Sequence, residues 1–438
     1  MPPTLEDRPV RRGAARGVRR NGIDAFHGLR YATLSDPANP CAATVPSSGQ
    51  LKGAELTDVP VFPQLPSRLE GVMGPGIRDN PQSDDAFFFN VWAPAEADRL
   101  PVLVFLHGGA WVSGGGAARW YRGERLASEG LVVVTLNYRI GPAGHLDDGV
   151  ADDRHRPIED CLAALRVVAD RIGDFGGDPD RIALAGQSAG AWYAWALSSL
   201  PETRGLIRRT ALFSIPAITP WTADSRRAFT ARVHETCDRN AGGWVPGALL
   251  EAGAKVLADS PRIPGAIPPM YLPVWPTERA GADLPLHVEA LHLRVTAQEM
   301  SVFLPPYAPG TRAASLLLET LRARTAGESL PEDPVPESWS RDRAETVARA
   351  SWHGFGRFAD AIGRAAAARG VRVTQHRFTA FAGPGDLGAT HCFDLPFQFG
   401  NRDDWRDAPM LEGWSAEAFE AVSRGLRAEI AGFVTRSP

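Results

Sequence analysis

A pentapeptide near the middle of the chain limits the possible folds more than any other segment: Gly186-Gln187-Ser188-Ala189-Gly190. It follows a short apolar run at 182–185 that is typical of a buried strand, and it precedes a helical pattern at 191–200. This context predicts a sharp strand-to-helix turn, because small residues on both sides of Ser188 let the chain reverse and hold the hydroxyl clear of the sheet. The backbone N–H of Ala189 would then lie at a helix N-terminus, where it can donate to a developing oxyanion.

Other short apolar runs have the composition of buried strands, and they lie at 87–92, 102–106 and 132–136, with further ones at 291–295 and 371–378. Between 132–136 and 182–185, apolar residues at 162, 165, 168 and 172 predict one helix face, and Gly173 follows where a helix would stop. A second amphipathic helix is predicted near the C-terminus, from Phe419 to Phe433. Strands that alternate with helices predict an α/β fold with a mostly parallel sheet and helices on both faces.

No fixed-period repeat and no low-complexity linker divides the chain. We therefore expect a single domain over residues 1–438. The segments 221–290 and 305–345 are richer in proline and glycine and have only weak helical periodicity. We expect them to form cap-like excursions over the sheet that provide a pocket wall.

Charge and cysteine content exclude several classes of function. The 47 basic and 51 acidic residues give a net charge of −4, so the basic excess of a nucleic-acid-binding protein is absent. Four cysteines without a CxxC pair do not form a disulfide scaffold. No run of about 18 apolar residues predicts a membrane span, and no apolar stretch follows the N-terminal arginines as a secretion signal requires. The expectation is a cytoplasmic protein that binds neither nucleic acid nor membrane.

A second motif, His107-Gly108-Gly109-Ala110-Trp111, comes directly after the strand-like run 102–106. Such a glycine-rich loop leaves backbone N–H groups free to approach a ligand closely. Together with the turn at Ser188, it supplies the two sets of donors that an acyl-transfer site needs. We interpret His107 as a structural residue that orients this loop, and not as the catalytic base.

The series of motifs resembles the type-B carboxylesterase family, the α/β-hydrolases that include cholinesterases and bacterial para-nitrobenzyl esterases. The resemblance is carried in order by residues 89–94, 107–111, 137–141, 175–179 and 186–190, with weaker matches at 21–32 and 388–397. It therefore spans nearly the whole chain. In α/β-hydrolases the catalytic serine is followed along the chain by an acid and then by a histidine.

The resemblance implies a triad of Ser188, Glu299 and His391. Glu299 follows the run 291–295 in a segment similar to the one that carries the family's glutamate, although Gln298 and Met300 replace its usual aspartate and glycine. His391 lies within the matching segment 388–397. The same motif positions imply an oxyanion hole made by the N–H groups of Gly109, Ala110 and Ala189.

The activity implied is that of a serine carboxylesterase that hydrolyses a neutral, fairly apolar small-molecule ester through an acyl-enzyme, with no metal or organic cofactor. Gln187 stands where a glutamate is common, which weakens the case for a cationic substrate. Aromatic residues are frequent around the site loops, and three are candidate substrate contacts: Trp111, Trp192 and Phe303. His287, Glu289 and His292 lack the spacing of a zinc motif, so we expect them to form a solvated or half-buried face.

Two alternatives stay open at this point. The acyl-enzyme could pass its acyl group to an acceptor other than water, giving transesterification or lactone formation, because water exclusion and pocket shape select the acceptor. The chain could instead be a catalytically silent binding protein on the same fold, since function does not follow from fold alone. A missing contact within the triad would favour the silent protein. The natural ester and the oligomeric state are left open by the sequence.

Overall fold

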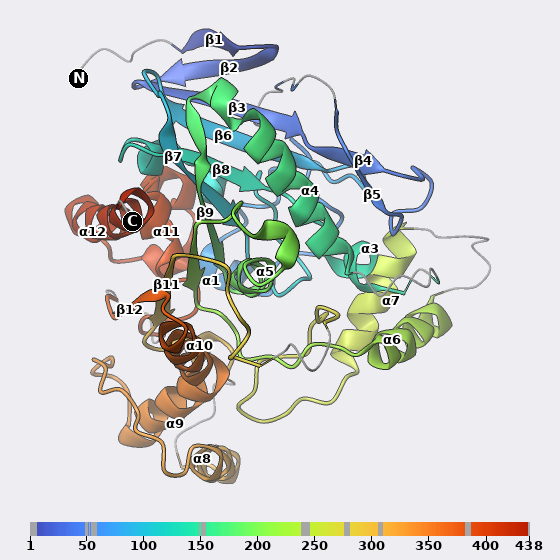
Figure 1. The fold of residues 1–438 in the computed structure, drawn as a ribbon. Coiled ribbons are helices and arrows are strands. Elements are labelled where there is room, and N and C mark those ends of the chain that lie inside the picture. The colour runs from blue at the N-terminus through green and yellow to red at the C-terminus, as the bar shows by residue number, and fades with distance from the viewer. Residues whose placement is uncertain are drawn as a thin grey trace.

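A ten-stranded sheet runs through the computed structural model of this protein (Figure 1). The strand order is β1-β2-β3-β6-β8-β7-β9-β10-β11-β12. The bounds are β1 (Arg8–Arg12), β2 (Ala15–Arg20), β3 (Ile23–Arg30), β6 (Phe88–Pro94), β7 (Leu100–Leu106), β8 (Val132–Leu136), β9 (Gly177–Gln187), β10 (Arg209–Phe213), β11 (Ala290–Thr296) and β12 (Arg372–Phe378). The two short strands β4 (Ala32–Leu34) and β5 (Thr44–Pro46) pair separately. The structure describes residues 7–48, 51, 53, 59–147, 149, 155–237, 246–275, 281–304, 310–381 and 387–436.

The sheet has a parallel half and an antiparallel half. Neighbouring strands from β8 through β7, β9, β10 and β11 to β12 are all parallel. From β1 through β2 and β3 to β6, and between β6 and β8, the pairing is antiparallel. The parallel half carries the turn at Ser188, and its strands are joined through helices as the α/β prediction requires.

Helices cover both faces of the sheet. Successive side chains of a strand point to opposite faces, so Val102, Val104 and Leu106 of β7 pack in one core while Leu103 and Phe105 pack in the other. The first core contains α4 (Arg156–Arg171), α5 (Ala189–Leu197) and α10 (Arg357–Ala368). The second contains α2 (Glu124–Ala127), α11 (Leu395–Phe399) and α12 (Ala416–Thr435). The predicted α/β-hydrolase architecture is confirmed.

Four further helices lie in the two regions expected to form caps or to follow them. They are α6 (Ala223–Thr236), α7 (Pro246–Ala258), α8 (Arg312–Arg324) and α9 (Arg341–Ser351). Figure 1 shows α6 and α7 together at one side of the molecule and α8 and α9 beyond α10. Weak periodicity under-predicted these helices, two of which begin with a threonine cap, Thr222 on α6 and Thr311 on α8. Parts of both expected caps, at 238–245, 276–280 and 305–309, lie outside the described residues.

The structure differs from the sequence-based prediction where a strand or a helix end carries no apolar run. The strands β1 and β2 carry several arginines and form an edge hairpin with exposed side chains, so no apolar run predicts them. Helix α4 begins at Arg156, six residues before the first position of its predicted apolar face at 162, and Pro157 lies in its first turn, where a missing N–H costs nothing. The strand β8 coincides with its predicted range.

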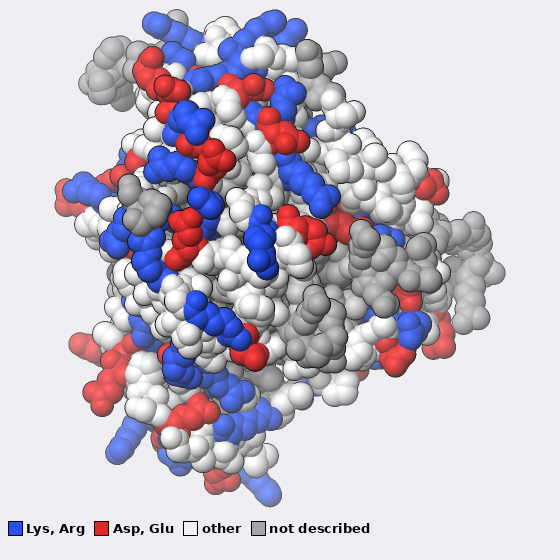
Figure 2. Space-filling model, viewed as in Figure 1, with Lys and Arg blue, Asp and Glu red and all other residues white. Residues whose placement is uncertain are grey.

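Surface charge and helix composition bear on whether the chain binds nucleic acid or a membrane. On the face shown in Figure 2, basic and acidic side chains are interspersed, in keeping with the small net charge of −4. Within the described ranges, no helix combines the length and the apolarity that crossing a bilayer requires.

Candidate active site

Ser188 occupies a strained turn between β9 and α5. Its backbone has φ 56° and ψ −119°, a left-handed conformation that non-glycine residues rarely adopt. The two flanking glycines are required by close contacts. A Cβ added to Gly186 would lie 2.2 Å from the Gly190 carbonyl oxygen, and a Cβ added to Gly190 would lie 2.2 Å from the Leu106 carbonyl oxygen. The predicted sharp turn is therefore present, and its two glycines have a steric cause.

The structure brings together the three residues expected to form the triad. Ser188 Oγ lies 2.8 Å from His391 Nε2, and His391 Nδ1 lies 2.5 Å from Glu299 Oε2. Glu299 begins the short helix η7 (Glu299–Val302), just past the end of β11, and its second oxygen accepts a hydrogen bond of 2.8 Å from the Thr296 N–H. All three side chains are buried. The chain Ser188–His391–Glu299 is continuous, so the contact whose absence would favour a silent protein is present.

Groups beside His391 favour its protonated form. Burial lowers the pKa of His391, but the adjacent Cys392 thiol and the Glu299 carboxylate outweigh it and raise the pKa above its ordinary range. Gln187 Nε2 donates to Cys392 Sγ at 3.0 Å. Gln187 thus links the residue before the nucleophile to the residue after the histidine, and it adds no charge to the site.

Gln298 joins the loop of Glu299 to the loop of His391. Its backbone N–H donates to the Ala389 carbonyl at 2.9 Å, and its side-chain Oε1 accepts from the Ala389 N–H at 2.8 Å. Ser301 Oγ adds a third bond between the two loops by donating to the Leu387 carbonyl at 2.6 Å. Sequence reasoning noted Gln298 only as a departure from the family pattern. No local signal could reveal this role, because its partners lie about ninety residues further along the chain.

The loop after β7 holds unpaired backbone donors beside Ser188. Gly109, Ala110 and Trp111 all have positive φ values, of 124°, 53° and 57°. In the part of the chain that the structure describes, neither the Gly109 nor the Ala110 N–H donates a hydrogen bond, and both residues line the cavity that contains Ser188. Ala189 is the first residue of α5, so its N–H has no acceptor within the helix.

His107 holds this loop in place. Its ring stacks on Tyr138 with a centroid distance of 4.1 Å, and its Nδ1 lies 2.8 Å from the Gly108 carbonyl oxygen. The Tyr138 hydroxyl donates to the His107 carbonyl at 2.5 Å. Burial lowers the pKa of His107 to about 4, so the ring is neutral at pH 7. These contacts support the interpretation of His107 as a structural residue.

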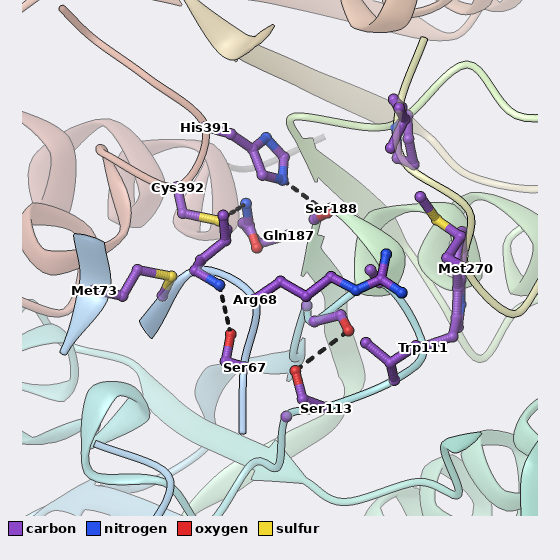
Figure 3. Close-up of a pocket in the computed structure, with 18 of the residues that line it drawn as sticks. Ser67, Arg68, Met73, Trp111, Ser113, Gln187, Ser188, Met270, His391 and Cys392 are labelled. Atoms are coloured by element: carbon purple, nitrogen blue, oxygen red, sulfur yellow. Dashed lines mark hydrogen bonds between the residues drawn. The ribbon is translucent and has the colours of Figure 1, made fainter. Parts of the chain in front are cut away.

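The cavity in front of Ser188 is lined mainly by apolar side chains (Figure 3). Trp111 and Phe303, two of the three expected substrate contacts, line it, and the Phe303 ring lies 5.4 Å from the His391 ring. Trp192 does not line the cavity. It lies on α5, every residue of which is buried, and its ring centroid is 6.4 Å from that of Trp111. The expectation for Trp192 is therefore corrected to support of Trp111. The Arg68 side chain also lines the cavity and brings a positive charge to it (Figure 3).

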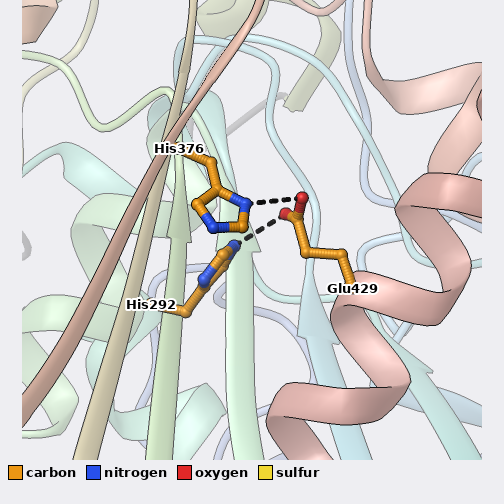
Figure 4. Close-up of side chains that lie close together, drawn as sticks. All are labelled: His292, His376 and Glu429. Carbon is orange, nitrogen blue, oxygen red and sulfur yellow. Dashed lines mark hydrogen bonds and ion pairs between the residues drawn. The ribbon is translucent and has the colours of Figure 1, made fainter.

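His292 lies in a polar cluster on the sheet (Figure 4). Its partners are His376 and Glu429, and not His287 or Glu289, and the three ligand atoms lie within 4.8 Å of one another. His292 Nε2 and His376 Nδ1 lie 2.9 and 2.7 Å from the two Glu429 oxygens. Arg294 already neutralises this carboxylate through a bond of 2.7 Å. We interpret the cluster as structural, because it joins β11 and β12 to α12.

Comparison with known proteins places the chain among esterases. A model of the carboxylesterase family matches residues 8–240, which include the loop at Gly109 and the turn at Ser188 but not Glu299 or His391. A probable N-octanoylanthranilate hydrolase from Rhodococcus erythropolis is 32% identical over 91% of this chain and 86% of its own. A phenmedipham hydrolase from Pseudarthrobacter oxydans is 30% identical over 95% of this chain and 87% of its own. The crystal structure of a Geobacillus stearothermophilus carboxylesterase at pH 6.2 superimposes with a TM-score of 0.75 at 26% identity, over 98% of this chain and 90% of its own.

Proposed function

This chain belongs to the carboxylesterase family, and we propose that Ser188, His391 and Glu299 carry out its hydrolysis of carboxylic esters. The observation that supports this assignment is the continuous hydrogen-bonded chain from Ser188 Oγ through His391 to Glu299. A nucleophile, a base within hydrogen-bond reach and a group that orients the base are the parts that covalent acyl transfer requires.

In the first half of the reaction, Ser188 Oγ attacks the ester carbonyl while His391 Nε2 takes the serine proton. Glu299 holds the imidazole in the correct tautomer and stabilises the imidazolium that forms. The negative charge on the carbonyl oxygen is held by the N–H groups of Gly109, Ala110 and Ala189. Loss of one such donor typically costs on the order of 10²–10³ in rate.

In the second half, the bond between the carbonyl carbon and the alcohol oxygen breaks, and His391 gives its proton to the leaving alcohol. The acyl group is then attached to Ser188 Oγ. His391 next removes a proton from water, which attacks the acyl carbonyl and releases the acid. The proton returns to Ser188, so the cycle is complete without a metal or an organic cofactor.

The apolar cavity lining favours an ester with an apolar body. The relatives that cover most of the chain are named as hydrolases, so acyl transfer to an acceptor other than water is not favoured. We also propose that the chain is one domain whose segments 221–290 and 305–345 serve as a cap. The four cysteines, all of which the structure describes, form no disulfide, which supports a reducing compartment and a cytoplasmic location.

The test is labelling with a fluorophosphonate, read by intact-mass analysis. Wild-type protein should gain one adduct and hydrolyse a 4-nitrophenyl ester, whereas Ser188→Ala should do neither while keeping the wild-type melting temperature. Ser67→Ala is the matched control, because Ser67 also lines the cavity and should label normally. An adduct on folded Ser188→Ala would contradict the assignment of the nucleophile.

A further inference from the structure

A second hollow lies beside the catalytic cavity, and Arg68, Val112 and Pro268 line both. Most of the other residues around the second hollow are apolar, and they come from the start of the chain and from α7 and the segment that follows it. Its polar side chains are those of Arg68, Arg262 and Tyr271. Among the described residues that line it, none is acidic. The hollow is therefore an apolar space with positive charge at one side.

Arg68 carries its charge into the junction between the two hollows. One of its guanidinium nitrogens donates to the Pro269 carbonyl at 2.5 Å, and Figure 3 shows the side chain extending across the cavity toward Met270. Partial desolvation of the guanidinium and the nearby charge of Arg262 both lower the pKa of Arg68, yet a guanidinium stays protonated in proteins. Within the described ranges, no carboxylate forms an ion pair with Arg68 or with Arg262. Two like charges therefore lie near each other without a neutralising acid.

Tyr271 adds a third donor. Its hydroxyl is buried, with 2% of the residue exposed, and has no hydrogen-bond partner in the described structure. Arg68 and Tyr271 both line the second hollow, and the charge of Arg68 opposes the rise in the Tyr271 pKa that burial causes. A buried hydroxyl without a partner costs free energy, and native proteins seldom leave one in that state. Arg68 thus donates to one backbone carbonyl, and the Tyr271 hydroxyl has no acceptor among the described residues.

Arginines elsewhere in this chain show the contrast. Arg139 is fully buried and forms a two-point ion pair with Asp160, at 2.7 and 2.9 Å. Arg294 is buried between Asp394 and Glu429. Each of these two buried arginines is paired with a carboxylate inside the fold. Arg68 and Arg262 are exposed and have no such pair among the described residues, so an acid from outside the chain can reach them.

We propose that Arg68, with Arg262 and Tyr271, binds an acidic group at one end of an otherwise apolar ester whose carbonyl lies at Ser188. A carboxylate suits this set because it accepts two parallel hydrogen bonds from a guanidinium and a third from a hydroxyl. The inference rests on the proposed esterase function and narrows its substrate class. In place of a neutral ester, the substrate has an apolar body that reaches Ser188 and an anionic end that reaches Arg68.

Two series of esters test this inference. In the first, 4-nitrophenyl esters share one linear acyl chain that ends in a carboxylate, a carboxamide or a methyl group. In the second, octanoate esters of 4-hydroxybenzoate and 4-hydroxybenzamide place the charge on the alcohol side. In at least one series, wild-type kcat/KM should be about tenfold or more higher for the carboxylate than for the carboxamide, mainly through KM.

Arg68→Gln should remove this preference, so that kcat/KM for the carboxylate ester falls to the value for the carboxamide ester. Arg166→Gln is the matched control, since Arg166 is an exposed arginine on α4, and it should keep the preference. Equal kcat/KM for the carboxylate and carboxamide esters in both series would overturn the inference. It would also be overturned if Arg68→Gln lowered kcat/KM by the same factor for the carboxylate ester and the carboxamide ester.

Failure of the esterase function has a different signature, because the wild type would then cleave no ester at all, the methyl-ended one included. In that case the inference is tested by calorimetry, which measures binding to Ser188→Ala of the dicarboxylic acid that corresponds to the carboxylate-ended acyl chain of the first series. Binding that Arg68→Gln loses would support it, and no binding would overturn it.

Discussion

Glu299 shows how a single side chain can serve catalysis from within the core. The residue is 1% exposed, and its two carboxylate oxygens contact the Thr296 N–H and the His391 ring. Since a hydrogen-bonded carboxylate beside an imidazole favours the protonated ring, Glu299 is one of the groups that raise the pKa of His391. The same interaction is available when His391 takes the serine proton.

At this scale we predict that Glu299→Gln lowers kcat by about 10⁴, by analogy with the loss of a triad acid in other hydrolases. The base works only when neutral, so activity falls as the pH decreases through the His391 pKa. Without the carboxylate that pKa is lower, and the acidic limb of the kcat/KM profile should move to lower pH. Steady-state kinetics across pH, with exposed Glu412 changed to Gln as control, measure both effects. An unchanged kcat would mean that another acid completes the triad.

At the scale of elements, the site depends on how the ends of neighbouring strands are joined. Strand β11 delivers Glu299 and the loop after β12 delivers His391, and the paired bonds between Gln298 and Ala389 hold the two together. Gln298 touches no reacting atom and so acts as a positioning residue. Small displacements of reacting groups can cost as much as about 10² in rate.

We therefore expect Gln298→Ala to lower kcat by roughly 10- to 100-fold with little change in KM. The free energy of unfolding should fall by about 1–3 kcal/mol, because the buried Ala389 N–H loses an acceptor. Gln375→Ala, at an exposed position on β12, should alter neither quantity. The rate of fluorophosphonate labelling separates the cases: if it stays at the wild-type value while stability falls, Gln298 has a structural role only.

At the scale of the whole molecule, buried histidines make the stability of the fold depend on pH. Burial is the main cause that lowers the pKa of His27 to about 3, of His107 to about 4 and of His145 to about 3. In the unfolded chain each would titrate near its ordinary value of about 6.5. Between pH 6.5 and about 4 the unfolded state thus binds more protons than the folded state, and stability falls as the pH decreases.

The expected slope approaches about 1.4 kcal/mol per pH unit for each such histidine. His391 does not oppose it, because a raised pKa contributes its full stability below pH 6.5. Chemical denaturation at pH 7.0, 6.0 and 5.0 measures the slope. His145→Gln should reduce it, whereas the same change at the exposed His234 should not. A free energy of unfolding that is flat from pH 7 to 5 would show that the folded protein admits protons to these rings.

The features that the sequence determined by itself are the ones with a local physical cause. Gly186 and Gly190 are required by contacts at the turn and by the neighbouring strand end, so the position of Ser188 could be recognised from five adjacent residues. Strands buried on both faces, such as β8, could be recognised from apolar composition alone. The edge strands β1 and β2 could not, because hydrogen-bond pairing and not burial defines them.

Tertiary structure decided which distant groups meet. Many acids follow Ser188 along the chain, and only folding brings Glu299 and His391 into one hydrogen-bonded chain with it. Packing also places Trp192 behind Trp111 and not in the cavity lining, since α5 is buried on every side. Arg68 is held at the cavity by a hydrogen bond to the Pro269 carbonyl, which is about two hundred residues away in sequence. Steric requirements act between neighbours in the chain, whereas cavities and charge pairing depend on segments that only the folded sheet places side by side.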